Sequence, residues 1–408
     1  MHPRHSSARR PLIRNGLGGS PSNPVQSLTE VRISVKLDKR VAILTSILVT
    51  EDDRIMFSGA DRYLVHLYGF LEESGYEPCV WQVGSGDRLL NGMKIQGLSK
   101  GGTEFGGLPD LNIQFFEHTV SYGKAIYFAL PLAFPRVKPK SIVISHGIGW
   151  DYPAHPWSPL SGPLKDEWLR RLRYAVTASD LVVSVDTNTL NWLRATWPGY
   201  EHKQVYIPNF VDGNEFFPGE NRGHRESLVI FYPRRLTWIR GLDDVKVVAE
   251  KLTRRYDFLE FHIVGRGGTD DSEAEMHRWA EENPRCLYYW VSMENMAELY
   301  RKADIVLIPT RGAEGTSLAC LEAMACGKPV ICGHVGGLTD LVIDGYNGVL
   351  INVSPETLEA AIEYLVLNPE IRQTLGRRAL ETSLAFSLER WKERWRAALR
   401  GVWGDDGR

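Results

Sequence analysis

The stretch that decides the fold is EGTSLACLEAMACGKPVI, residues 314–331. An apolar run at 305–309 precedes it and has the length and composition of a buried parallel strand. From Thr316 to Cys326 the apolar residues recur at helical spacing, and Gly327 ends the pattern before a further strand. We therefore predict a strand, a loop and a helix in direct succession.

The start of the predicted helix has the properties of an anion site. The amides of Thr316, Ser317 and Leu318 would point beyond the carboxyl end of the strand, where open parallel sheets bind phosphorylated ligands. A helix N-terminus also carries about half a positive charge. Since Glu314 and Glu322 flank this place, the sequence predicts an anion site between two acids.

The composition narrows the function classes. The 408 residues are 43% hydrophobic and 24% charged, which is ordinary for a globular protein, and the length favours two domains. A formal net charge of -2 gives no general attraction to nucleic acid. Five cysteines without a C-x-x-C pair indicate a reducing compartment, and we interpret them as core residues.

Neither a signal peptide nor a membrane span is predicted. Residues 1–30 combine arginines with serine, proline and glycine and contain no apolar run, which predicts a flexible tail. No other run reaches the ~18 apolar residues that a span needs, so we expect a cytoplasmic protein. Contact with the inner face of a membrane is an alternative, and a solvated helix is the simpler account of the residues that suggest it: Trp168, Arg170, Arg171 and Arg173.

Strand and helix patterns alternate along the chain in two series, separated by the glycine-rich and proline-containing segment 209–225. In the first series we expect strands at 40–45, 78–83, 113–116, 141–145, 181–185 and 205–208, and helices at 60–74, 119–130, 165–175 and 186–197. In the second we expect strands at 228–232, 261–264, 287–290, 305–308 and 349–351, and helices at 242–254, 272–282 and 294–301, with three helices closing the chain.

Two such series predict an α/β fold with two Rossmann-like, doubly wound domains that face each other across a cleft. The expected N-terminal domain, on the acceptor side, covers residues 31–210. The expected donor domain covers residues 211–387. The last helix, 388–402, is rich in tryptophan and is expected to pack back on the first domain.

The residues around the two glutamates resemble a known family. Glu314 and Glu322, with the Gly-Lys-Pro sequence that follows them, resemble the E-x7-E signature of retaining glycosyltransferases of the two-Rossmann-domain (GT-B) type, specifically family 4. The pair Gly336-Gly337 and the segments 300–304 and 344–348 are also similar, so the resemblance covers nearly all of the second domain. It implies the GT-B architecture.

The resemblance also implies an activity and its partners. The expected reaction moves a sugar from a nucleotide-diphosphate donor to a hydroxyl of a glycan, glycolipid or small molecule, with retention of the anomeric configuration. No metal ion or other cofactor is implied. The chain has no D-x-D sequence, the metal-chelating motif of the other main glycosyltransferase fold.

Family roles carry over to the opening stretch residue by residue. Glu314 would contact hydroxyls of the donor sugar, and the turn formed by Gly315, Thr316, Ser317 and Leu318 would hold the diphosphate. Glu322 would bind the ribose. These roles suit the chemistry, because a carboxylate accepts hydrogen bonds from vicinal hydroxyls through two oxygens.

The segment from Tyr232 to Gly241 resembles the family's Gly-Arg-Leu sequence with a Lys-Gly pair further on. Arg235 and Arg240 occupy the positions of the two cations that compensate the diphosphate as the nucleotide leaves. Arg234 stands where the family has glycine. Arginine keeps the positive charge that phosphate binding needs. Without the resemblance, such arginines would be read as surface charge.

Three further positions complete the predicted donor site. His146 follows an apolar strand at a position where the family often places a histidine facing the reacting sugar; a structural, hydrogen-bonded histidine is the alternative. Gly265 and Gly267 border the donor pocket and would permit close backbone approach. Ser292 lies at a strand end near Trp290, where the base is expected to rest.

On the acceptor side, the loop that contains Gly59 and Asp61 resembles the family's Gly-Gly-Ala-Glu-Arg sequence. A simple helix start is the alternative reading of this loop. Two alternative functions also stay open: a nucleotide-sugar 2-epimerase of the same fold, which would convert the donor without an acceptor, and an inactive sugar-nucleotide-binding scaffold. A dinucleotide oxidoreductase is disfavoured because the third glycine of its fingerprint is missing.

Overall fold

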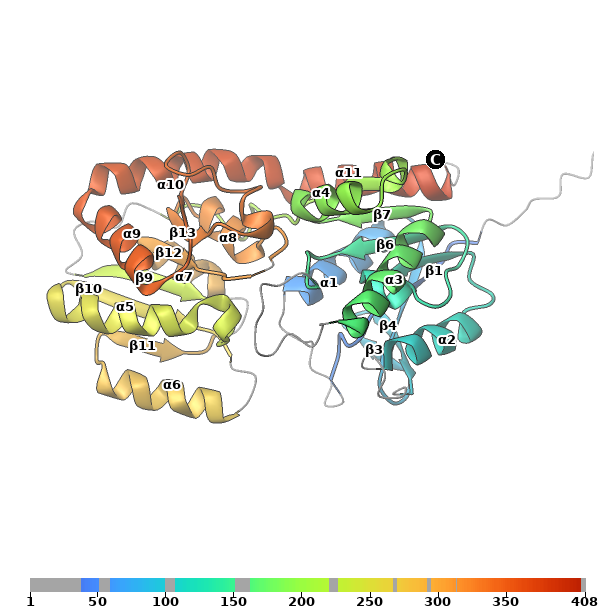
Figure 1. Ribbon diagram of the computed structural model, residues 1–408, viewed down its shortest axis with the longest axis horizontal. Coiled ribbons are helices and arrows are strands. Elements are labelled where there is room, and N and C mark those ends of the chain that lie inside the picture. The colour runs from blue at the N-terminus through green and yellow to red at the C-terminus, as the bar shows by residue number, and fades with distance from the viewer. Residues whose placement is uncertain are drawn as a thin grey trace, which may run out of the picture. The chain divides into compact units, whose positions relative to one another are not determined.

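The computed structural model describes residues 38–50, 59–99, 107–150, 162–219, 227–266, 270–291, 295–312 and 314–404. Strands and helices alternate to form two sheets with helices packed on them (Figure 1). One sheet has the strand order β3-β4-β2-β1-β5-β6-β7-β8, and the other has the order β11-β10-β9-β12-β13-β14. The predicted pair of doubly wound α/β units is confirmed.

The first sheet is parallel except at its β3 edge. Its strands are β1 Arg40–Leu44, β2 Glu77–Val83, β3 Arg88–Leu90, β4 Met93–Leu98, β5 Lys124–Tyr127, β6 Ser141–Ser145, β7 Leu181–Ser184 and β8 Gln204–Tyr206. Its helices are α1 Gly59–Glu73, α2 Leu108–His118, α3 Pro163–Ala178 and α4 Thr187–Thr196. The central strands are apolar runs because helices cover both faces of the sheet.

The second sheet is parallel throughout its pairings. Its strands are β9 Leu228–Pro233, β10 Leu259–Val264, β11 Cys286–Tyr289, β12 Ile305–Ile308, β13 Val330–Gly333 and β14 Val349–Ile351. The helices that follow them are α5 Leu242–Arg255, α6 Asp270–Glu282, α7 Met296–Lys302, α8 Leu318–Ala325, α9 Pro355–Leu367, α10 Pro369–Ser383 and α11 Leu388–Trp403.

Two predicted elements of the first series were wrong. The strand expected at 113–116 lies inside α2, and the helix expected at 119–130 contains strand β5. In α2 the buried side chains Leu111 and Phe115 lie four residues apart, on one helical face, and Gly107 with a φ of 77° precedes the first turn. Strand β5 is buried along its whole length between β1 and β6, so its apolar run reflects burial on both faces.

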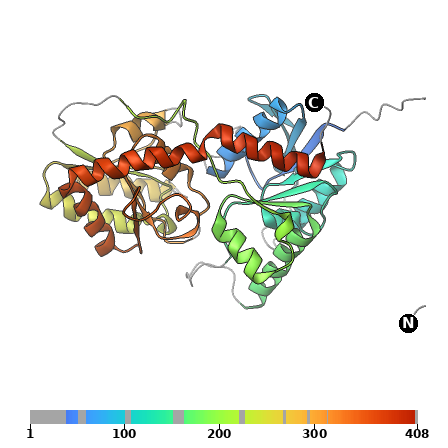
Figure 2. The same cartoon turned by 90° about the horizontal axis from the view of Figure 1, so that it is seen from above.

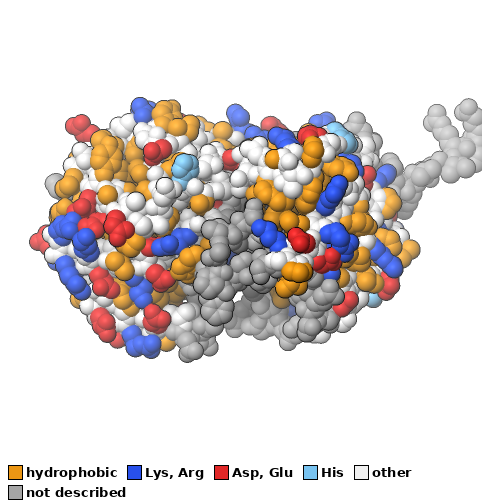
Figure 3. Space-filling model, in the orientation of Figure 1, with side chains coloured by type: hydrophobic (Ala, Val, Ile, Leu, Met, Phe, Trp, Pro, Cys, Tyr) orange, Lys and Arg blue, Asp and Glu red, His pale blue; other side chains and the backbone are white. Residues whose placement is uncertain are grey.

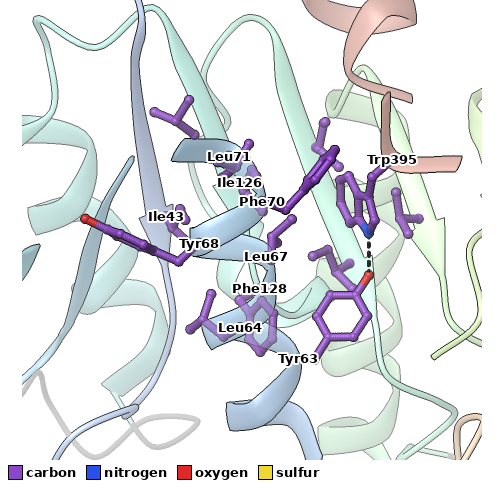
Figure 4. Close-up of a cluster of buried hydrophobic side chains, with 14 of the residues drawn as sticks. Ile43, Tyr63, Leu64, Leu67, Tyr68, Phe70, Leu71, Ile126, Phe128 and Trp395 are labelled. Atoms are coloured by element: carbon purple, nitrogen blue, oxygen red, sulfur yellow. Dashed lines mark hydrogen bonds between the residues drawn. The ribbon is translucent and has the colours of Figure 1, made fainter. Parts of the chain in front are cut away.

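The last helix, α11, packs on the core of the first sheet. Trp391, Trp395 and Trp403 belong to the same buried cluster as Tyr63 and Phe70 of α1. Trp395 Nε1 donates a hydrogen bond of 2.9 Å to the hydroxyl of Tyr63 (Figure 4). Figure 2 shows α11, in red, beside the blue elements of the first sheet, which include α1. Burial of the indole rings therefore ties the C-terminal end of the chain to the first sheet.

Two backbone segments run from one sheet to the other and lie side by side, one at Val211 and the other at residues 386–388. Val211, in the segment that leaves the first sheet, donates to Phe386 O over 2.9 Å, and Leu388 N donates back to Val211 O over 3.1 Å. These bonds form a short parallel bridge at Val211 and Ser387. The two backbone segments that run between the sheets are therefore hydrogen-bonded to each other.

The cysteines and the surface charges are distributed as the composition predicts. All five cysteines are buried and unbridged, which confirms their reading as core residues. Acidic and basic side chains are interspersed over the face drawn in Figure 3, in keeping with the small net charge. Among the described residues, no helix is both long enough and apolar enough to cross a membrane.

Candidate active site

The predicted succession of strand, loop and helix is present at β12, the described loop residues 309–312 and 314–317, and α8, whose first residue is Leu318. The pair Gly336-Gly337 packs directly on this loop. Gly337 N donates to Glu314 O over 2.8 Å, and a Cβ atom at position 337 would lie 2.5 Å from the amide nitrogen of Thr316. Only glycine permits this approach, so the pair fixes the path of the loop.

The carboxylate of Glu314 is held by three donors on one oxygen. Oε2 accepts from Arg234 Nη2 at 2.5 Å, from Thr310 Oγ1 at 3.1 Å and from Arg240 Nη1. The side chain is 11% exposed. Two guanidinium groups beside a largely buried carboxylate stabilise its ionised form.

Of the two arginines predicted for the diphosphate, the structure places Arg240 at Glu314. Arg235 is exposed, and within the described part of the chain its side chain forms no hydrogen bond or ion pair, so its role remains a prediction. Arg234, which we had not assigned, reaches Glu314 instead. Arg234 is largely buried and Arg235 is exposed, and this difference in burial separates the two neighbours.

Gly265 supports the same end of β9. A Cβ atom at this position would lie 1.9 Å from Arg234 O, so the backbone after β10 needs a glycine to pass beside Arg234. The close approach at Gly265 is to protein backbone, and its place at the donor pocket stays a prediction. Gly267 and Ser292 lie outside the described residues. Among the described residues, the guanidinium of Arg266 lies 4.2 Å from the ring centroid of Trp290, which is 44% exposed.

Glu322 pairs with an arginine from the first sheet. Arg62 Nη1, in α1, binds Glu322 Oε1, and the side chains are 24% and 5% exposed. Arg62 also lies over the ring of Phe216, with 5.8 Å between Cζ and the centroid. Burial and the charge of Glu322 raise the pKa of the Tyr300 hydroxyl well above its ordinary value. We had not predicted Arg62, although it directly follows Asp61 in the acceptor-side motif.

The acceptor-side residues lie at the start of α1. A Cβ atom at Gly59 would lie 3.5 Å from Leu318 Cδ1, so the first residue of α1 meets the first residue of α8. Asp61 is 8% exposed, in the first turn. Their assignment to an acceptor stays a prediction.

The side chain of Thr316 binds backbone groups at Val185 and Asn209, which belong to the first half of the chain. Its fully buried hydroxyl donates to Val185 O over 2.8 Å and accepts from Asn209 N over 2.7 Å. Its hydroxyl is therefore not available to a diphosphate. The amides of Thr316, Ser317 and Leu318 form no hydrogen bond within the residues that the structure describes. These amides fit the predicted role of anion donors at a helix start.

His146 lies directly beside the glutamate loop. Its carbonyl oxygen would be 2.9 Å from a Cβ atom at Gly315, and its ring packs against Phe128 with 4.5 Å between centroids. Burial lowers the pKa of His146 to about 4, so the imidazole is neutral near pH 7. Nε2 is buried without a partner among the described residues. A neutral ring of this kind suits a hydrogen bond to a hydroxyl.

The comparisons with known proteins find a family match in the second half of the chain. Residues 214–382 match the family described as Glycosyl transferases group 1. This segment, less than half of the chain, is similar to the group 1 glycosyltransferase domain. The domain contains both glutamates and the arginines at the end of β9, while His146 and Arg62 reach it from the first half.

Two curated relatives cover parts of the chain. D-inositol 3-phosphate glycosyltransferase of Segniliparus rotundus is 28% identical over 243 residues, which are 55% of this chain and 54% of that protein. An uncharacterized glycosyltransferase of Methanocaldococcus jannaschii is 43% identical over 100 residues, which are 24% of this chain and 28% of that protein. The match spans about half of the first relative and less of the second.

Solved structures share the fold over most of the chain. Sucrose-phosphate synthase from Thermosynechococcus elongatus superposes with a TM-score of 0.74 at 18% identity, covering 89% of this chain and 99% of that one. HepE of Anabaena in complex with UDP gives a TM-score of 0.69 at 17% identity, covering 88% and 99%. At such identities the likeness shows the fold, and it confirms the GT-B architecture expected for a group 1 glycosyltransferase domain.

Proposed function

We propose that this protein is a glycosyltransferase of the family 4 type, which moves a hexosyl group from a nucleotide-diphosphate sugar to a hydroxyl acceptor with retention. The observation that carries the proposal is the loop at the start of α8. There Glu314, anchored by Arg234 and Arg240, stands beside three amides that are free among the described residues. This arrangement suits a sugar on one side and a diphosphate on the other.

The residues of the proposed donor site would act on two parts of the substrate, the charged diphosphate and the hydroxyl groups. The amides of α8 and the side chains of Arg235 and Arg240 would bind the diphosphate and stabilise the charge that develops as it leaves. Glu314 would accept from sugar hydroxyls, and Glu322 from the ribose. HepE has been solved with UDP and with UDP-glucose, which supports a nucleoside diphosphate sugar as the donor class.

We propose departure and attack on the same face of the sugar. A covalent intermediate requires an unencumbered carboxylate opposite the leaving group. Glu314 is engaged by two guanidinium groups, whose positive charges lower the nucleophilicity of the delocalised carboxylate as a whole. An oxygen of the leaving diphosphate would then help to deprotonate the acceptor hydroxyl, while neutral His146 donates or accepts a hydrogen bond at a sugar hydroxyl.

The proposed enzyme needs no metal ion, because Arg235, Arg240 and the helix start supply positive charge at the diphosphate. A cytoplasmic location also stays a proposal. Membrane contact through α3 is less favoured, since Arg170 and Arg171 both bind Glu167, at 2.6 and 2.7 Å between Nε and carboxylate oxygens. The acceptor itself remains the broad class of glycans, glycolipids and small hydroxyl compounds.

The test is transfer from a panel of nucleotide sugars, with EDTA present, to alcohol and glycan acceptors. Wild-type protein should release nucleoside diphosphate in an acceptor-dependent reaction, and Glu314→Gln should reduce the rate at least about 100-fold with nearly unchanged nucleotide binding. Conversion of the donor without any acceptor would instead identify the 2-epimerase. Binding without transfer or hydrolysis for any donor would identify a scaffold.

A further inference from the structure

Arg234 is a buried arginine that bridges two parts of the candidate site. It follows β9, and its side chain is 9% exposed. Nη2 donates to Glu314 Oε2 at 2.5 Å and to Thr310 Oγ1 at 3.1 Å, while Nη1 donates to Ser317 Oγ at 3.1 Å. One guanidinium group thus contacts the glutamate proposed for the sugar and the residue that precedes α8.

The donors of Arg234 point into the protein. Both terminal nitrogens are engaged by side chains, and Nε is buried without an acceptor among the described residues. Arg235 differs, because it is exposed. The two adjacent arginines therefore differ: Arg235 is accessible to a ligand phosphate, whereas the terminal nitrogens of Arg234 are engaged by side chains of the protein.

The contacts on Glu314 leave one of its oxygens available. Arg234, Arg240 and Thr310 all donate to Oε2, and Oε1 takes part in no hydrogen bond formed within the described ranges. An ionised carboxylate has lone pairs on both oxygens. Anchoring Oε2 in this way fixes the direction of Oε1 and keeps its lone pairs for hydroxyl donors.

We infer that Arg234 is a positioning residue, which holds the Glu314 carboxylate and the start of α8 in one geometry so that sugar and diphosphate are aligned together. The inference rests on the proposed function. It is specific to this chain, because the resemblance places glycine at this position, and glycine has no side chain to make the bridge. Alignment matters for rate, since a misplacement of about 1 Å can reduce it about 100-fold.

The experiment is a double-mutant cycle on Arg234→Met and Glu314→Gln, with Arg254→Met as a control. Arg254 lies on α5 with 76% of its side chain exposed and one ion pair at 3.7 Å. The kcat and donor KM are measured with the best donor, and the affinity for the matching nucleoside diphosphate is measured by calorimetry. The unfolding temperature of each variant is recorded.

Arg234→Met should lower kcat about 10- to 100-fold while the nucleoside diphosphate Kd changes less than about threefold. Adding Arg234→Met to Glu314→Gln should cause little further loss, because both changes remove the same alignment. Guanidinium salt should restore part of the kcat of Arg234→Gly without affecting Glu314→Gln. Arg254→Met should behave as wild type.

Three results would overturn the inference: an unchanged kcat in Arg234→Met, independent losses that multiply in the double variant, or a loss of kcat matched by an equal loss of nucleotide affinity. If Arg234→Met does not fold, Arg234→Lys replaces it in the same cycle. If wild-type protein shows no transfer, the proposed function fails. The cycle is then run on the ratio of nucleotide-sugar to nucleoside diphosphate affinity, where the coupling of Arg234 to Glu314 still has to appear.

Discussion

Arg62 of α1 binds Glu322 of α8, and this ion pair links a helix on the first sheet to the helix that begins at the candidate diphosphate site. The contact uses Glu322 Oε1, and only 5% of the glutamate side chain is exposed. Under the proposed function, ribose hydroxyls approach the same carboxylate. Arg62 and the ribose of the donor would therefore bind the same carboxylate, that of Glu322.

Replacing Arg62 by glutamine should tighten nucleotide binding. A neutral ribose hydroxyl has to compete with a charge-assisted hydrogen bond at Glu322 Oε1, and the substitution removes that competitor. We expect the Kd of the nucleoside diphosphate to fall about 3- to 10-fold in calorimetry, together with a lower unfolding temperature, because Glu322 is left buried without its cation.

The matched control is Lys392→Gln, which breaks another ion pair of α1, between Lys392 and Glu73 at 2.7 Å. This pair is partly exposed, and Glu73 is the last residue of α1, about 16 Å along the helix axis from Arg62, so nucleotide affinity should not change. Weaker binding by Arg62→Gln would mean that Arg62 itself contacts the donor.

Gly337→Ala should impair the loop that carries Glu314. The added methyl group would lie 2.5 Å from both the carbonyl carbon of Gly315 and the amide nitrogen of Thr316, so the backbone has to move. We expect a loss of about 1–3 kcal/mol in the free energy of unfolding and weaker nucleotide binding. Gly401→Ala, in α11 where an added Cβ meets nothing within 4 Å, should stabilise by up to about 1 kcal/mol. Equal effects of the two substitutions would refute the packing argument.

Two buried groups should give opposite pH dependences of stability. Burial raises the pKa of Asp186, the N-cap of α4, from 3.8 to about 6. Between these values the native state holds a proton that the unfolded chain lacks, so this contribution decreases as pH rises. Burial lowers the pKa of His146 from 6.5 to about 4. Between about pH 4 and 6.5 the unfolded chain holds a proton on His146 that the native state lacks, so the stability contribution of His146 rises with pH.

The two contributions are each on the order of 3 kcal/mol and overlap between about pH 4 and 6, so they largely cancel in the wild type. Asp186→Asn should make the free energy of unfolding rise more steeply with pH than in wild type. His146→Gln should shift the slope in the opposite direction. Urea unfolding at pH 4, 5, 6 and 7 gives the three profiles, and parallel profiles would contradict both assignments.

Local patterns explain which parts of the fold could be predicted. The strand, loop and helix around residues 314–331 combine a buried strand, a helical period and a terminating glycine, and these signals agree. At 113–116 the pattern was ambiguous, because Ile113, Phe115 and Phe116 suit a short strand as well as a helix. Only packing decided it, with Leu111 and Phe115 facing the core.

The candidate site was predictable where one segment carries it, and less so where distant segments meet. Glu314 and the helix start lie in a single motif. Arg62 lies 260 positions from its partner Glu322, and no local pattern links them. Arg234 was visible as a departure from the family's glycine, but its inward direction depends on Thr310 and Ser317, which come from another strand end.

The hydrogen bond between Trp395 and Tyr63 permits a test of how α11 is anchored. Both side chains are fully buried, and Trp395 Nε1 donates to the Tyr63 hydroxyl over 2.9 Å. Trp395→Phe removes the donor and part of the ring, and should lower the free energy of unfolding by about 1–3 kcal/mol; Tyr63→Phe should lower it by about 1 kcal/mol. The double variant should be less destabilised than the sum of the two, because neither polar partner is then left alone. Strict additivity in urea unfolding would show that the bond contributes nothing and that ring packing alone holds α11 on the first sheet.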